Sequence, residues 1–459
     1  MSSRVAGKKY DVDMTRGGIF KHLVVFALPL MLGNVFQMLY NAVDTWVLGN
    51  YVSNEAFSGV GSVGPIANML VGLFSGIASG AGIVIAQYYG AKKEEEANKG
   101  VHTAMILTFI ASVFVTVVGV LISPACVALM KVPDAAASEA LTYLRIYFFG
   151  ITGLLIYNMG AGILRAFGDS KRPFYFLIIS SLINIAGDLI CVVWLGLGVA
   201  GVAIATVFSQ FISALAVLII LFRHKGTAKM EIRRLKLNPS LAKKIIRVGI
   251  PTGIQMSLVS FSNIFVNSYF NAFGTDCMSG WTAFNKIDNF AVVPVSALSA
   301  AVSTFVAQNL GAKELQRARR GLAISTVAAI TLMIFLTAPI MIFAPAMVRF
   351  FNPTPSVVEI GAMYLRYLTP FYICFALNQM YAGSLRGAGH AKNVTLMMIS
   401  CFVVIRQAYL IIVTKFISNT MLSVGFSMPF GWICATIALL VYYKKVDLTK
   451  NRVIGTDLD

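Results

Sequence analysis

Two acidic side chains interrupt long apolar stretches of the sequence. Asp188 lies in PFYFLIISSLINIAGDLICVVWLGLG, one helical turn after Asn184, and Asp44 lies in another apolar stretch near the N-terminus. A carboxylate in the middle of a membrane costs roughly 2.5–3.5 kcal/mol, so a functional role is the first interpretation. The structural alternative is that Asp44 caps the outer end of its helix and Asp188 bonds a neighbouring span.

The chemistry open to these residues depends on their depth. If their stretches are spanning helices, Asp188 and Thr206 lie roughly 10 Å below the outer surface, and Asp44 lies roughly 6–9 Å below it. Asn184 shares a helix face with Asp188. Two carboxylates, an amide and a hydroxyl can form a cage for a hard cation or an acid pair that shares a proton. We therefore predict a cation- or proton-coupling site, and we expect no metal ion there other than Na⁺.

The elements that must position these side chains are membrane-spanning helices. Of the 459 residues, 58% are hydrophobic and only 12% are charged, whereas a soluble chain has roughly 25% charged residues. Apolar runs long enough to cross a bilayer recur twelve times. The predicted spans are 20–48, 56–88, 101–124, 138–161, 173–195, 198–222, 243–270, 279–308, 322–345, 357–381, 393–415 and 418–443. The predicted fold class is an all-α polytopic membrane protein.

The basic residues predict the orientation of the chain. There are 37 Lys and Arg against 19 Asp and Glu, and most of the basic residues fall in the N-terminus, in every second loop and in the C-terminus. This is the positive-inside pattern, so we expect both termini in the cytoplasm and a location in a bacterial-type inner membrane. The basic stretch RHKGTAKMEIRRLKLNPSLAKKIIR (223–247) should lie along anionic lipid headgroups. This distribution argues against a nucleic-acid partner.

The sequence contains an internal repeat at an offset of 221 residues. AQYYGAKKEEEANKG (86–100) matches AQNLGAKELQRARRG (307–321), and AGILRAFGDSK at 161 matches AGSLRGAGHAK at 382. Because each half has six spans, both halves enter from the same side, and such parallel repeats are typical of transporters. We predict an N-terminal six-helix bundle (1–222), a basic cytoplasmic linker (223–242), and a C-terminal six-helix bundle with a cytoplasmic tail (243–459).

With these motifs and YNAVDTWVLGN in the first span, the chain resembles the multidrug and toxic compound extrusion (MATE) family. The resemblance implies a secondary antiporter with alternating access, in which a cleft between two bundles exports substrate while Na⁺ or H⁺ enters. In the DinF-like branch of the family, the cation site has aspartates in the first and fifth helices, an Asn and a Thr. The matching residues here are Asp44, Asp188, Asn184 and Thr206.

Other polar residues in the spans predict a substrate cavity. Asn34, Gln37, Asn41 and Asp44 recur at spacings that place them on one helix face, and Tyr40 could add an aromatic wall. The structural alternative is hydrogen bonding between helices. The residues that could line the other wall are Gln255, Asn263, Asn267 and Asn378.

The second half of the chain does not copy the acid pair, because Tyr409 and Phe265 stand at the positions of Asp188 and Asp44. It has instead Lys286, Asp288 and Arg406, whose depths of roughly 10–15 Å allow contact. This cluster is either a charge-compensated network that holds the second bundle together or part of the substrate path.

The chain lacks a nucleotide-binding loop, a nucleophile triad and a metal motif, and its six cysteines have no CxxC spacing. We therefore expect no enzyme activity and no cofactor besides the coupling ion. The predicted function is export of amphipathic or cationic organic compounds by a monomer. The alternative is a flippase for a lipid-linked oligosaccharide, whose pyrophosphate would favour several basic residues in the cavity. A gated channel would instead give uncoupled flux.

Overall fold

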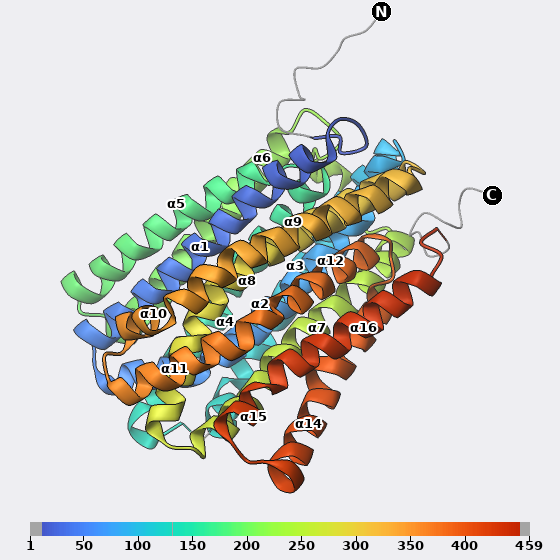
Figure 1. Cartoon of the computed structure of the whole chain (residues 1–459). Coiled ribbons are helices and arrows are strands. Elements are labelled where there is room, and N and C mark those ends of the chain that lie inside the picture. Colours follow the sequence, from blue (N-terminus) through green and yellow to red (C-terminus); the bar gives the residue numbers. More distant parts are fainter. Residues whose placement is uncertain (1–11, 131, 450–459) are drawn as a thin grey trace, which may run out of the picture. The chain divides into compact units, whose positions relative to one another are not determined.

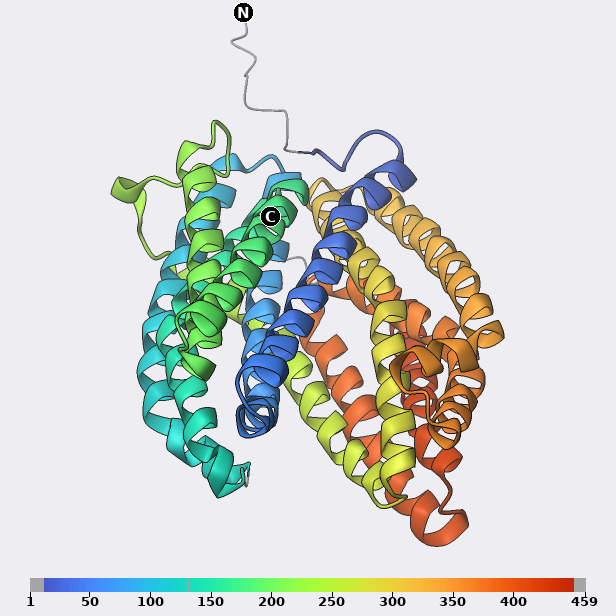
Figure 2. The ribbon, with the colours of Figure 1, turned by 90° about the vertical axis from the view of Figure 1, so that its left-hand side faces the viewer.

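The computed structural model describes residues 12–130 and 132–449, and this part of the chain is helical without a β-strand (Figures 1 and 2). Eleven helical segments in it are long and apolar enough to cross a membrane. They coincide with eleven of the twelve predicted spans. The helix at the place of the remaining span, α7 (Pro239–Asn271), has a lower hydropathy because Lys243, Lys244 and Arg247 lie near its start and polar residues follow. The predicted all-α membrane fold is confirmed.

Two compact units make up the structure, and their boundaries differ from those of the sequence repeat. Of the described residues, unit 1 comprises 12–13, 29–130 and 132–253, and unit 2 comprises 14–28 and 254–449. The first ten residues of α1 (Ile19–Tyr51) therefore belong to unit 2, and the first part of α7 belongs to unit 1. Each change of unit falls at or next to a proline inside the helix, Pro29 or Pro251.

In unit 1 the central helix is α4 (Asp134–Ala166), which packs against α2 (Asn54–Gly90), α3 (Glu94–Leu129) and α6 (Gly198–Arg223). α5 (Lys171–Asp188) and its π-helical continuation η1 (Leu189–Trp194) pack against α6. Small residues let the neighbours of α4 approach closely, since Gly153 lies against the backbone of Phe211 and Gly162 against Ala78. Such small-residue contacts are typical of helices packed in membranes.

Unit 2 repeats this arrangement. α8 (Thr275–Gly311) packs against α9 (Leu315–Ile342), α11 (Pro355–Leu368) and α12 (Tyr372–Gly387), and α12 also packs against α16 (Ser427–Lys445). At the repeat offset, α11 and α12 correspond to α4. The remaining helical segments are α10 (Ala344–Phe351), η3 (Thr369–Phe371), α13 (Ala391–Ile399), η4 (Ser400–Ile405), α14 (Arg406–Ile412), η5 (Val413–Ile417) and α15 (Met421–Gly425).

The two GAK sequences form the same turn in both units. Among the described residues, the non-glycine residues with positive φ are Lys92, at 60°, and Lys313, at 63°. They occupy equivalent positions of the repeat, directly after α2 and after α8. This left-handed conformation is unfavourable for a residue with a Cβ, so its occurrence in both copies marks the turn as part of the duplicated fold.

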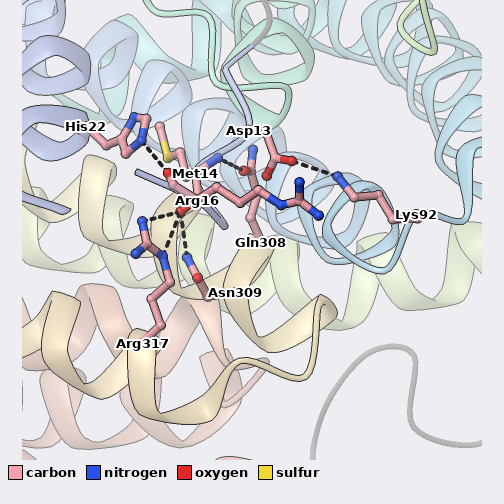
Figure 3. Close-up of polar contacts among 8 residues, drawn as sticks. All are labelled: Asp13, Met14, Arg16, His22, Lys92, Gln308, Asn309 and Arg317. Carbon is pink, nitrogen blue, oxygen red and sulfur yellow. Dashed lines mark hydrogen bonds and ion pairs between the residues drawn. The ribbon is translucent and has the colours of Figure 1, made fainter. Parts of the chain in front are cut away.

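The segment before α1 is held in unit 2 through its backbone. The amide of Met14 donates to Gln308 at 3.0 Å, and its carbonyl accepts from Asn309 and from Arg317 (Figure 3). Arg317 also donates to the carbonyl of Gly17 at 2.8 Å. The Met14 side chain is only 1% exposed. Residues of the α8–α9 corner thus fix the approach of the chain to α1.

The predicted basic linker has a corresponding attachment in unit 1. Asn98, near the start of α3, donates to the carbonyls of Thr227 and Lys229 at 2.8 and 2.7 Å. His102 accepts from the amide of Glu231 at 3.0 Å. The linker contains one short helical turn, η2 (Ile232–Arg234). Its backbone is therefore packed against α3 over part of its length.

Candidate functional site

The structure places the four residues of the predicted coupling site together in unit 1. Asp44 comes from α1, Asn184 and Asp188 from α5, and Thr206 from α6. The Asn184 amide donates to the Thr206 hydroxyl at 3.4 Å, and that hydroxyl donates to the carbonyl of Val202 at 2.9 Å. The Asp44 carboxylate interacts with both Asp188 and Thr206. Asp188 is 0% exposed and Asn184 only 1%.

Local sequence explains why α5 and α6 come close at this point. Gly187 directly precedes Asp188, and a Cβ at Gly187 would lie 3.0 Å from the Cβ of Ala205 in α6. The absence of a side chain at Gly187 therefore brings the α5 backbone near Thr206. α5 changes to the π-helical turn η1 immediately after Asp188. Single π-helical turns inside helices are frequent at functional sites.

The acceptor oxygens of this cluster exceed its donors. Four buried oxygens of this cluster have no hydrogen-bond partner among the described residues: Asp44 Oδ1, Asn184 Oδ1, and both carboxylate oxygens of Asp188. An unsatisfied buried acceptor costs about 1–3 kcal/mol, and more if it is charged. Such a set of oxygens fits a bound proton or a hard monovalent cation, either of which supplies the missing positive charge.

A polar cavity of about 120 Å³ adjoins this cluster, and Asn184 belongs to both. Of the predicted cavity residues, Asn34, Gln37 and Tyr40 line it, whereas Asn41 is exposed and does not. Polar residues that the sequence reasoning missed complete the lining: Tyr157, Asn158, Arg165, Ser180, Ser181, Ser209, Gln210 and Ser213. All of them belong to unit 1.

Most of the missed residues had a signal in the sequence. Ser180 lies four residues before Asn184 on α5, and Ser209, Gln210 and Ser213 follow Thr206 at helical spacing on α6. These spacings extend the α5 face of Asp188 and the α6 face of Thr206. Arg165 had a different signal, because the LR pair is one of the features that the two halves of the repeat share.

The residues predicted for the other cavity wall lie in unit 2 and have mixed environments. Asn263 accepts a hydrogen bond from Arg406 at 2.9 Å, and Asn267 accepts from the Trp281 indole at 3.0 Å. Both asparagines therefore have structural partners. Gln255 and Asn378 are buried, and their side-chain oxygens have no partner among the described residues.

The predicted cluster of Lys286, Asp288 and Arg406 is not a mutually compensated set of charges in the structure. Asp288 is buried and accepts from the Tyr372 hydroxyl at 2.7 Å, whereas Arg406 donates to Asn263. Lys286 is exposed. No ion pair joins these three residues among those described. The physical reason is rotation about the helix axis, because residues two apart in α8 face different directions although they lie at similar depth.

Comparison with known proteins agrees with this architecture. The MatE family model matches the chain twice, over residues 29–190 and 251–412. The chain is 28% identical over 441 residues to the probable multidrug resistance protein YoeA of Bacillus subtilis, covering 94% of this chain and 95% of that protein. It is 26% identical over 454 residues to the probable multidrug resistance protein NorM of Thermotoga maritima, covering 95% and 96%.

A solved structure also shares the fold. An outward-facing multidrug resistance MATE family transporter of the MOP superfamily superposes with a TM-score of 0.89 at 24% identity, covering 95% of this chain and 97% of that chain. The two family matches correspond to the two halves of the repeat, so the resemblance read from the motifs is confirmed at the level of the family. The chain is a multi-pass membrane protein and belongs to the MatE family.

Proposed function

We propose that the protein is a secondary antiporter that exports amphipathic, often cationic, organic compounds in exchange for Na⁺ or H⁺. Asp44, Asn184, Asp188 and Thr206 form the coupling site in this proposal. The observation that carries it is the set of buried acceptor oxygens without donors, directly beside a polar cavity that shares Asn184. The names of the relatives as multidrug resistance proteins support export as the direction of transport.

Coupling requires that the ion change the protein's affinity for the substrate. Asn184 offers a direct route for this effect, since it touches the acid cluster through Thr206 and lines the cavity. A cation or proton on the acid pair would draw the free Asn184 oxygen toward it and alter the cavity wall. In this proposal Asn34, Gln37 and Tyr40 contact the substrate. The basic loops face the cytoplasm of a bacterial-type cell, which follows from the positive-inside rule.

A flippase for a lipid-linked oligosaccharide fits the cavity less well. Its pyrophosphate needs several cationic side chains, whereas Arg165 is the one charged residue in the lining. We also propose that Na⁺ occupies the coupling site and that protons compete for the same carboxylates. The amide and hydroxyl beside the two acids favour this reading, because they supply oxygens that a proton does not need.

Thermal melting of the purified protein tests the ion site. A ligand at a hundredfold excess over its Kd stabilises the folded state by about 2.7 kcal/mol, so the protein should melt higher in NaCl than in choline chloride at equal ionic strength. The increment should shrink with falling pH and vanish in Asp188→Asn. Asp288→Asn is the matched control, since Asp288 is a buried acid that already has a donor; it should keep the Na⁺ increment.

Transport completes the test. Export by vesicles should follow an imposed Na⁺ gradient and should be lost in Asp188→Asn at normal expression. Equal melting in the two salts, together with transport driven by a pH gradient alone, would replace Na⁺ coupling with proton coupling. Normal gradient-driven export by Asp188→Asn would refute the coupling site itself.

A further inference from the structure

Arg165 has an unusual position for a charged residue. It lies in the last turn of α4 and lines the cavity of unit 1 together with Tyr157 and Asn158 from the same helix. The other lining residues are neutral, namely amides, hydroxyls and apolar side chains. The lining of the cavity therefore carries one fixed positive charge, and the acid pair is not part of this lining.

The guanidinium of Arg165 has neither a hydrogen bond nor an ion pair with any described residue. Its electrostatic neighbour is Tyr157, a neutral phenol whose hydroxyl donates to the carbonyl of Pro173 at 3.0 Å. A guanidinium has five N–H donors, and those of the part-buried Arg165 have no acceptor among the described residues. The protein itself therefore offers no compensation for this charge.

The surroundings of Arg165 define what kind of ligand would compensate it. Leu154, Phe174 and Leu177 provide apolar walls, and Ser180 and Asn184 lead from the cavity to the acid cluster. A planar guanidinium binds carboxylates through two parallel hydrogen bonds. A matching ligand has a carboxylate at one end to bind Arg165, an apolar body to contact the apolar walls, and a cationic group directed toward the acid cluster.

We propose that Arg165 is a specificity-determining residue that binds the carboxylate of zwitterionic amphipathic substrates in the unit 1 cavity. This inference rests on the proposed function, because it takes the cavity to be the substrate site. It goes further in naming a substrate class. Compounds that carry only a cation leave Arg165 without a partner and bind less tightly than their carboxylate-bearing counterparts.

The repeat supplies a matched control. Arg386 occupies the equivalent position at the end of α12, and its guanidinium also has no hydrogen bond or ion pair with a described residue. It belongs to unit 2 and is not among the residues that line the unit 1 cavity. Removing either guanidinium deletes the same chemical group from equivalent places in the duplicated fold, and of the two only Arg165 lines the unit 1 cavity.

Binding of a pair of dyes to the purified full-length protein tests the proposal. Rhodamine B carries a carboxylate and a delocalised cation, and its methyl ester keeps only the cation. We expect the unmodified protein to bind rhodamine B about tenfold more tightly than the ester, the effect of one charge-assisted hydrogen-bonded pair. Arg165→Gln should abolish this preference by weakening rhodamine B alone. Arg165→Lys should keep part of it, and Arg386→Gln should keep all of it.

Unchanged ester binding in Arg165→Gln also shows that the variant is folded. The proposal is overturned if Arg165→Gln weakens both dyes equally, if Arg386→Gln removes the preference as well, or if the unmodified protein does not favour rhodamine B. Carboxylate-selective binding without gradient-driven transport would refute the antiporter function and leave the role of Arg165 intact. Coupled transport without carboxylate selectivity would refute the role of Arg165 and leave the antiporter function intact.

Discussion

A pair of glycine-rich helix faces in unit 1 makes a strong prediction about stability. Gly76 and Gly80 of α2 face Gly253 and Gly249 of α7 with their backbones in contact. A Cβ placed on Gly76 would lie 2.3 Å from the Cα of Gly253, and one on Gly80 would lie 2.3 Å from the Cα of Gly249. Both helices therefore have the Gly-x-x-x-Gly spacing that permits close helix contact in membranes. The perturbation is Gly76→Ala.

Two effects of opposite sign set the magnitude. Ala is favoured over Gly within a helix by about 0.5–1 kcal/mol. Carbon atoms in contact are normally about 3.5–4.0 Å apart, so the new methyl group forces α2 and α7 apart by more than about 1 Å. Overpacking of this kind costs about 1–3 kcal/mol. We therefore expect Gly76→Ala to destabilise the protein.

Gly61 is the control on the same helix, since nothing lies within 4 Å of a Cβ placed there. Gly61→Ala gains the helix propensity without the clash, so the difference between the two variants isolates the steric cost of about 1–3 kcal/mol. For a domain of this size, each kcal/mol lowers the melting temperature by about 2–4 °C. Adding Gly80→Ala to Gly76→Ala should cost less than the sum, because both push the same helices apart.

The assay is heating of detergent-purified protein followed by size-exclusion chromatography of the folded fraction. Gly61→Ala should melt at or above the temperature of the unmodified protein, and Gly76→Ala should melt below it. Equal melting temperatures for Gly76→Ala and Gly61→Ala would refute the close backbone contact between α2 and α7.

Two further predictions concern unit 2. Asp288→Ala should lower the melting temperature because it leaves the Tyr372 hydroxyl without its acceptor, at a cost of about 1–3 kcal/mol. Adding Lys286→Ala should not raise the melting temperature again, and a recovery in that double variant would instead indicate a charge pair between Lys286 and Asp288. Arg317→Ala removes donors to the backbone before α1, so limited chymotrypsin digestion should cut the N-terminal segment faster. Arg320 is an exposed neighbour, so Arg320→Ala should not change the digestion rate. Equal digestion rates for the two variants would contradict the anchoring role of Arg317.

The proximity of Asp44, Asn184, Asp188 and Thr206 could be predicted from the sequence for a physical reason. Polar groups in apolar spans are few, and the regular rise of a helix converts their positions into depths. The short connections between consecutive spans place α5 and α6 side by side. The repeat could also be predicted from the sequence. Its motifs include turns such as GAK, whose left-handed residue constrains the sequence in both copies.

Other features depend on rotation about the helix axis, which depth does not determine. Lys286 and Asp288 lie at similar depths but on different faces of α8, so their sequence proximity suggested a contact that the structure does not contain. The glycine contact between α2 and α7 could not be predicted from the sequence for a related reason. Gly76 and Gly253 are far apart in sequence, and neither glycine carries a side chain whose polarity would mark the helix face.

The duplicated fold itself provides the strongest argument that the acid cluster is a ligand site. At the position of Asp188, unit 2 has Tyr409, whose ring stacks on Phe430 at 4.7 Å and whose hydroxyl donates to the carbonyl of Ser423 at 3.1 Å. The polar group that replaces Asp188 in unit 2 therefore has a hydrogen-bond partner. The four unpartnered oxygens of the acid cluster are not a requirement of this position in the fold. Since their burial destabilises the bare protein, their presence in unit 1 supports the proposal that a cation or proton binds at the acid cluster.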